Sequence, residues 1–154
     1  MTETPAYHPG AQGLQGVIAL SNEVERELAR ALAVNLTDYR ALSALAMGGP
    51  VTVGGLAERL GTTAATTTAI VNRLEARGYA DRERVDGDRR QVRVSVSPAC
   101  FGRILGLMRP LMDATNAHLW SLPPEEGDAV ARFLAVVQDH LRAQLDALAS
   151  GEPS

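Results

Sequence analysis

Apolar residues recur at helical spacing over most of the chain, with charged residues on the opposite side of the same stretches. Four segments are predicted to be helices from this pattern: 14–34, 38–47, 98–120 and 125–149. Thr37 is the expected N-cap of the second helix, which ends at the sequence Gly48-Gly49-Pro50. Pro110 lies inside the third helix and predicts a kink there.

The middle of the chain carries shorter helical stretches separated by glycine. Residues 51–53 form a β-branched strand stub, and a short helix over 54–60 is expected to end at Gly61. Thr63 is the expected N-cap of a helix over 64–77 that Gly78 ends. The residues at its inward positions follow the spacing of a buried face: Thr67, Ile70, Val71 and Leu74.

After Gly78 the hydrophobic period changes from helical to alternating. Residues 79–84 and 91–96 are predicted strands, and Asp86-Gly87-Asp88 is a turn signal between them. Ser97 and Pro98 then suit the N-cap and first position of the next helix. We predict a mainly α fold with a small β-hairpin wing (α+β), which is a winged helix-turn-helix flanked by N- and C-terminal helices.

Composition limits the classes of function. A single cysteine, Cys100, allows no internal disulfide and no cysteine-based zinc site, which fits a cytoplasmic protein. The three histidines are scattered, so we expect no metal site and no cofactor. The apolar runs are too short for a membrane span, so no membrane partner is expected. The acidic, Pro/Gly-rich start has the composition of a disordered tail and not of a signal peptide.

The distribution of charge along the chain indicates an anionic partner, whereas the net charge of the whole chain does not. The net charge is −3, but residues 56–112 hold ten arginines and six acids. Residues 113–154 hold two arginines and seven acids. Binding to DNA depends on a local positive face that displaces counterions, and not on the charge of the whole chain.

A cluster of small hydroxyl-bearing residues opens the predicted helix over 64–77. A recognition helix in the major groove needs short polar side chains that reach base edges, and threonine methyls also contact the methyl group of thymine. The candidate contacts from this cluster are Thr62, Thr63, Ala64, Ala65, Thr66 and Thr68, with Thr67 assigned to the core. The alternative interpretation is a polar turn followed by a solvated helix face.

The predicted hairpin carries arginines along both strands and at its tip. Planar cations on a narrow hairpin suit the negative potential of the minor groove. The arginines are Arg82, Arg84, Arg89, Arg90 and Arg93, of which Arg84, Arg89 and Arg90 are the candidate DNA contacts. Asp88 is expected to hold one of its arginine neighbours. A solvated strand pair is the alternative, because Asp81 and Glu83 alternate with the arginines.

Residues 48–99 resemble the DNA-binding core of the MarR (multiple-antibiotic-resistance regulator) family. The resemblance rests on the sequence GLAERLG at 55–61, NRLEARG at 72–78 and the triplet DRR at 88–90, which alternating valines follow. It implies a homodimer whose first and last helices interlock, a promoter target, and a small-ligand cavity between the dimer helices and the winged lobe. It also adds Asn72 and Arg73 to the candidate DNA contacts.

This sequence departs from the family pattern in its recognition helix. Ala69 stands where many members have arginine or another polar residue, and Asn72 stands where aspartate is common. We therefore expect threonine and alanine to read A·T-rich or thymine-methyl positions. No cysteine stands in the N-terminal region, where the peroxide-sensing branch of the family uses one.

The resemblance gives a domain plan and a set of ligand-binding candidates. The plan is a disordered tail (1–13), a helical dimerisation region (14–36 and 99–149), a winged helix-turn-helix domain (37–98) and a second tail (150–154). The residues expected near a ligand are Tyr39, Met47, Met108, Met112 and Trp120, although core packing explains them equally well. Cys100 begins a helix, where a thiol is either reactive or, as we expect, buried and inert.

We predict a dimeric, sequence-specific DNA-binding transcriptional regulator. The favoured form is a repressor that a small aromatic or amphipathic ligand releases from a palindromic double-stranded operator. Two alternatives are a ligand-independent activator or architectural DNA-binding protein, and a winged-helix module that binds a protein. An enzyme is disfavoured, because no catalytic set and no phosphate-binding glycine loop falls at an expected cleft.

Overall fold

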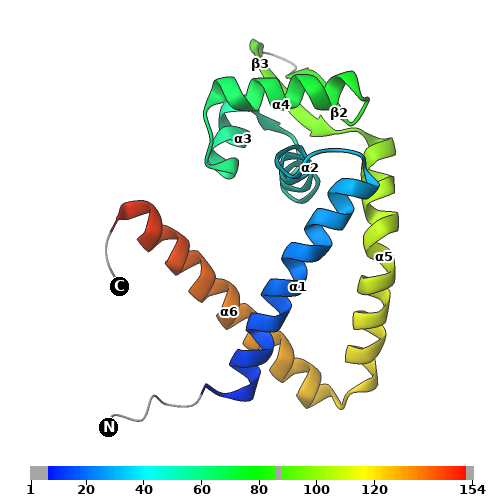
Figure 1. Ribbon diagram of the computed structural model, residues 1–154, viewed down its shortest axis with the longest axis vertical. Coiled ribbons are helices and arrows are strands. Elements are labelled where there is room, and N and C mark those ends of the chain that lie inside the picture. Colours follow the sequence, from blue (N-terminus) through cyan, green and yellow to red (C-terminus); the bar gives the residue numbers. More distant parts are fainter. Residues whose placement is uncertain (1–6, 86–87, 152–154) are drawn as a thin grey trace. The chain divides into compact units, whose positions relative to one another are not determined.

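The chain is helical with one small sheet, in the order expected for a winged helix-turn-helix (Figure 1). The computed structural model describes residues 7–85 and 88–151, with side chains for all of them except 85 and 88–91. The helices are α1 (Pro9–Ala31), α2 (Leu36–Gly48), α3 (Val53–Leu60), α4 (Ala64–Ala76), α5 (Pro98–Ser121) and α6 (Pro124–Ser150). The strands are β1 (Val51–Thr52), β2 (Ala80–Val85) and β3 (Asp88–Val96). The predicted fold class is confirmed.

The chain divides into two compact units, and each is described by itself. The first unit extends to Leu107 and contains α1 to α4, the sheet and the start of α5. The second unit begins at Met108 and contains the rest of α5 and α6. The helical dimerisation region expected over 14–36 and 99–149 stays a prediction.

The core of the first unit lies between α2, α3, α4 and β3, which contact one another. Its fully buried side chains are Leu32, Leu42, Leu45, Leu56, Thr67, Ile70, Val71, Leu74 and Val94. The inward face predicted for the helix over 64–77 is therefore confirmed. The three strands are antiparallel in the order β1-β3-β2, so the predicted strand stub forms the edge beside β3.

Local capping signals were correct around α3 and α4. Gly61 ends α3 in the left-handed conformation at φ 61°, where a side chain would be strained. Thr63 caps α4 by accepting a hydrogen bond from the amide of Thr66 at 3.1 Å. Gly78, at φ 69°, follows the end of α4 as expected. Ser97 caps α5, because its hydroxyl accepts from the amide of Cys100 at 3.3 Å.

Two helix starts were predicted wrongly. Helix α1 begins at Pro9, within the segment 1–13 assigned to a disordered tail, because proline suits the first helical position and His8 accepts from the amide of Gly10 at 3.0 Å. Helix α2 begins at Leu36, because the Asn35 side chain accepts from the amide of Asp38 at 2.8 Å. The N-cap of α2 is therefore Asn35 and not Thr37.

Candidate nucleic-acid interface

The N-terminal half of α4 presents a neutral, hydroxyl-bearing surface. Four of the residues on it, Thr63, Ala64, Ala65 and Thr66, are exposed, as is Thr68 one turn further on, and Thr62 is half-buried. The Thr63 hydroxyl donates to the Thr66 hydroxyl at 2.9 Å, and the Thr68 hydroxyl donates to the carbonyl of Ala64 at 2.8 Å. The structure therefore brings the six predicted threonine and alanine contacts together on one end of the helix.

The opposite side of α4 faces the core. Thr67 is fully buried, as the sequence predicted, and contributes its methyl group to the packing. Its hydroxyl oxygen has no hydrogen-bond partner among the described residues. The helix therefore presents different threonines to solvent and to the core.

Arg73, a predicted DNA contact, is exposed and pairs with a buried carboxylate of the first unit. Its Nε and Nη2 atoms donate to the two carboxylate oxygens of Asp38 at 3.1 and 2.6 Å. Asp38 lies in the first turn of α2 and is 4% exposed, so Arg73 neutralises a buried charge. Its hydrogen bonds to Asp38 raise the pKa of the Arg73 guanidinium further above its usual range.

Asn72, another predicted DNA contact, is turned toward the wing. Its side-chain oxygen accepts from Nη2 of Arg82 on β2 at 2.7 Å. Nη1 of the same guanidinium donates to Glu75 at 2.6 Å. One arginine of the wing therefore bridges two positions one turn apart on α4.

The register of the hairpin places Arg84 on the same face of the sheet as Arg82. Arg82 lies opposite Val94 and Arg84 lies opposite Val92, whereas Glu83 and Arg93 form a pair on the other face. Arg84 is exposed and makes no ion pair within the described part of the chain. Arg84 thus lies on the α4 side of the wing, where a cation can add to the surface of the recognition helix.

Arg89 and Arg90 belong to the first half of β3. Their side chains, and that of Asp88, lie outside the described part of the structure. The turn predicted at 86–88 also falls largely on residues 86 and 87, which are not described. The assignments of Arg89 and Arg90 as DNA contacts and of Asp88 as their partner stay predictions.

The five residues expected near a ligand are divided between the two units. Tyr39 is 7% exposed in the core of the first unit, whereas Met47 at the end of α2 is 89% exposed. Burial raises the pKa of the Tyr39 hydroxyl, with a smaller contribution from Glu25. In the second unit Met108 is half-buried, and Met112 and Trp120 are exposed.

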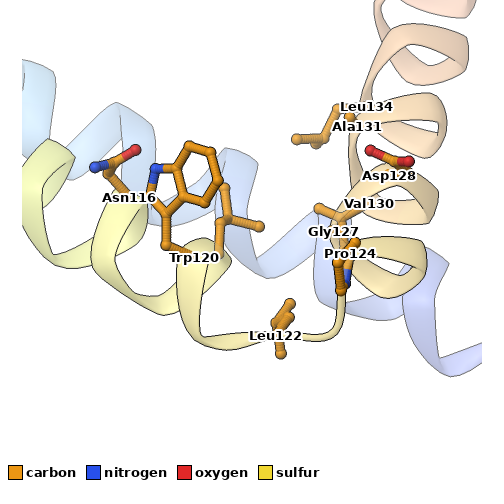
Figure 2. A pocket seen from close by; sticks show the side chains of 10 residues that line it. Asn116, Trp120, Leu122, Pro124, Gly127, Asp128, Val130, Ala131 and Leu134 are labelled. Atoms are coloured by element: carbon orange, nitrogen blue, oxygen red, sulfur yellow. The ribbon is translucent and has the colours of Figure 1, made fainter.

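Of these five residues, only Trp120 lines the pocket of about 450 Å³ at the corner between α5 and α6 (Figure 2). The other lining residues are mostly apolar: Asn116, Leu119, Leu122, Pro124, Gly127, Asp128, Val130, Ala131 and Leu134. Trp120 projects from the last turn of α5 on one side of the pocket, and Leu134 projects from α6 on the other (Figure 2). A cavity of this size and lining is typical of small-molecule sites.

Cys100 lies near the start of α5 and is 3% exposed. Burial raises the pKa of its thiol, and nearby Arg103 only partly offsets this effect. The thiol is therefore buried, as expected, and its inertness stays a prediction.

Some residues that organise the interface were missed in the sequence. Asp38 and Glu75 fix the arginines on either side of α4, and Arg103 on α5 donates to the carbonyl of Ala31 at 2.6 Å. The Asp38 and Arg103 contacts join positions 35 and 72 residues apart, and Glu75 joins a helix to a strand, so no single periodic pattern predicts them. Among residues 7–85 and 88–151 no cluster of three potential metal ligands occurs, and no helix is long and apolar enough to cross a membrane.

A helix-turn-helix with an exposed second helix, followed by an arginine-bearing wing, defines a winged-helix DNA-binding protein. A model of the MarR family matches residues 34–91. A Bacillus subtilis protein described as an uncharacterized HTH-type transcriptional regulator, YcgE, is 32% identical over 120 residues, which is 78% of each chain. The chain belongs to the MarR family of transcriptional regulators, and it is not an enzyme.

Solved structures agree on the fold. A MarR family protein from Bacillus stearothermophilus has a TM-score of 0.67 at 23% identity, covering 86% of this chain and 92% of that one. NadR, solved in complex with 4-hydroxyphenylacetate, has a TM-score of 0.57 at 19% identity, covering 89% and 96%. At these identities the likeness concerns the fold alone.

Proposed function

We propose that the chain acts in the cytoplasm as a homodimeric repressor that binds a palindromic operator and is released by a small aromatic or amphipathic ligand. The observation that carries the proposal is the exposed threonine and alanine surface of α4 beside Arg84 of the wing. A helix with small side chains enters the major groove, while the wing reaches the adjacent minor groove. Two such surfaces related by a two-fold axis read two half-sites.

The apolar faces of the terminal helices support a dimer. Helix α6 has no buried residue within the single chain, although its apolar residues recur at helical spacing. The exposed large apolar residues on it that do not line the corner pocket are Phe133, Val136, Leu141, Leu145 and Leu148. Helix α1 adds Val17, Ile18, Leu20 and Val24. Exposed apolar surface on this scale is typical of a protein interface.

The corner pocket of the second unit is the candidate ligand site. Its volume of about 450 Å³ suits a single-ring aromatic compound, and Trp120 offers a face for stacking. The complex of NadR with 4-hydroxyphenylacetate supports an aromatic acid as the first ligand to test. Because Trp120 is the one tryptophan of the sequence, its fluorescence reports occupancy directly.

A footprint on the DNA upstream of the chain's own gene tests the proposal. We expect protection of two half-sites about one helical turn apart and release of the DNA by a ligand that also changes Trp120 fluorescence. Arg84→Ala and Arg90→Ala should each weaken binding and lower the salt dependence by about one phosphate contact. A single protected half-site contradicts the dimer, and protection that no aromatic acid relieves favours the ligand-independent alternative. Absence of DNA binding at low salt favours the protein-interaction module.

A further inference from the structure

Helix α4 is joined to the elements on both sides of it by arginines. The Arg73–Asp38 pair links it to α2, and the Arg82 bridge links Asn72 and Glu75 to β2. We propose that Arg73 and Arg82 are positioning residues, which set the angle of α4 against α2 and the wing and do not bind DNA phosphates. The inference rests on the proposed recognition of a specific operator and deepens it.

The Arg73–Asp38 pair fixes α4 against a rigid turn. Both carboxylate oxygens of Asp38 accept from the same guanidinium, and this two-point geometry restrains rotation as well as distance. The amide of Asp38 donates to the Asn35 cap, so the carboxylate is anchored to the start of α2. A phosphate that drew the Arg73 guanidinium away from Asp38 would leave that carboxylate buried without its cation.

The Arg82 bridge fixes the wing against α4. Two nitrogens of one guanidinium donate to two side chains one helical turn apart. The Asn72 oxygen accepts from Arg82, which holds the amide in one orientation toward the wing. Glu75 places a negative charge beside the guanidinium, which weakens its attraction for a phosphate.

These two connections explain the neutral character of the recognition surface. Arg73 and Arg82 pair with carboxylates of the chain itself, which leaves threonines and alanines exposed on the N-terminal half of α4. Small neutral side chains reach base edges only when the helix approaches closely and at the correct angle. The helix and the wing must also fit adjacent grooves at the same time. Accurate positioning of α4 therefore determines operator affinity.

Arginine-to-lysine substitutions separate positioning from phosphate binding. Lysine keeps the charge and a phosphate contact but cannot reproduce a two-point guanidinium contact. We expect Arg73→Lys and Arg82→Lys each to lower operator affinity about tenfold, the scale of one lost base contact, while affinity for unrelated DNA stays unchanged. The measurement is fluorescence anisotropy on operator and on scrambled DNA of equal length, over a salt series.

Arg40 provides the matched control. Its Nε and Nη2 donate to both carboxylate oxygens of Glu25 at 3.1 and 3.0 Å, which links α2 to α1 without contact to α4. Arg40→Lys removes the same two-point geometry, and we expect operator affinity to stay within about twofold of the original chain. Equal losses from Arg40→Lys and Arg82→Lys would contradict a specific role for α4.

A charge exchange tests the Arg82 bridge even where a lysine variant unfolds. Arg82→Glu alone should lower operator affinity, and the double variant Glu75→Arg with Arg82→Glu should recover at least half of the loss in log affinity. The single variant Glu75→Arg shows what the new arginine adds by itself. A double variant that binds as poorly as Arg82→Glu assigns Arg82 to phosphate binding and overturns the inference. If the unaltered chain prefers no operator over scrambled DNA, the proposed function fails instead.

Discussion

Thr67 shows the cost of using threonines in a recognition helix. Its side chain is fully buried, and its hydroxyl oxygen makes no hydrogen bond with any described residue. A buried hydroxyl without a partner costs about 1–3 kcal/mol relative to one that is hydrogen-bonded or solvated. Valine has nearly the same shape without that oxygen.

We therefore expect Thr67→Val to raise the free energy of unfolding by about 1 kcal/mol. Chemical denaturation followed by circular dichroism measures the change, and operator affinity should be unaffected because Thr67 faces the core. Thr68→Val is the control, since Thr68 is exposed and its hydroxyl donates to Ala64. A loss of stability in Thr67→Val would show that a water or a residue outside the described part satisfies the hydroxyl.

Cys100 gives a prediction that depends on pH. Its thiol pKa is raised in the folded chain by burial, so the neutral thiol favours the folded state. The contribution of this thiol is fully present below the pKa of an unfolded cysteine and is lost as pH rises through the folded value. We expect iodoacetamide at mildly alkaline pH to modify native Cys100 at least about tenfold more slowly than the urea-unfolded chain. Equal rates would indicate an exposed, reactive thiol.

At the scale of single residues, local chemistry was predictable and long-range pairing was not. The roles of Thr63, Gly61 and Thr67 follow from residue type and helical period within a few positions. The partner of Arg73 lies 35 positions earlier, and only tertiary packing brings the two together. The sequence therefore could not predict that Arg73 pairs with the buried carboxylate of Asp38.

At the scale of elements, the end of α1 depends on side chains from two other parts of the first unit. The Tyr79 hydroxyl donates to the carbonyl of Leu32 at 2.9 Å, and Arg103 donates to the carbonyl of Ala31 and to the Tyr79 hydroxyl. These donors satisfy two of the carbonyls that a helix C-terminus leaves without partners. The guanidinium of Arg77 lies over the Tyr79 ring at 5.7 Å from its centre.

We expect Tyr79→Phe to lower the free energy of unfolding by about 1 kcal/mol, because the buried Leu32 carbonyl loses its donor. Thermal unfolding measures this change. The helical content by circular dichroism should stay the same, because Arg103 still donates to Ala31. Unchanged stability would mean that water replaces the hydroxyl at no cost.

The sequence predicted which helices and strands form better than it predicted where each one begins and ends. The hydrophobic period gave every helix and strand, because each buries one face or alternates across a sheet. The start of α1 was missed because its first turn is Pro/Gly-rich and its cap is a histidine, which is not among the usual capping residues. The ligand candidates stay predictions, because an apolar residue type indicates burial but not which side chains share a cavity.

At the scale of the whole molecule, α6 requires a partner for its apolar face. Leu141, Leu145 and Leu148 recur at helical spacing and are 48%, 66% and 69% exposed in the single chain. A helix of 27 residues with no buried side chain gains little stability from its own unit. The second copy of the chain is the partner that the proposed function provides.

Leu145→Glu combined with Leu148→Glu should therefore convert the dimer to a monomer, because two charges would be buried in the interface. Sedimentation equilibrium measures the mass. Operator affinity should fall by about a hundredfold or more, because the second winged domain is no longer tethered to the one that binds the first half-site. Ala143→Glu adds a charge to the opposite side of α6, about half a turn away from Leu141, Leu145 and Leu148, and should leave both quantities unchanged. The mass and the operator affinity of the two variants together distinguish two ways in which the prediction could fail. A variant that stays dimeric would show that the dimer interface lies elsewhere than on this part of α6. A monomer with full affinity would show that one winged domain suffices for the operator.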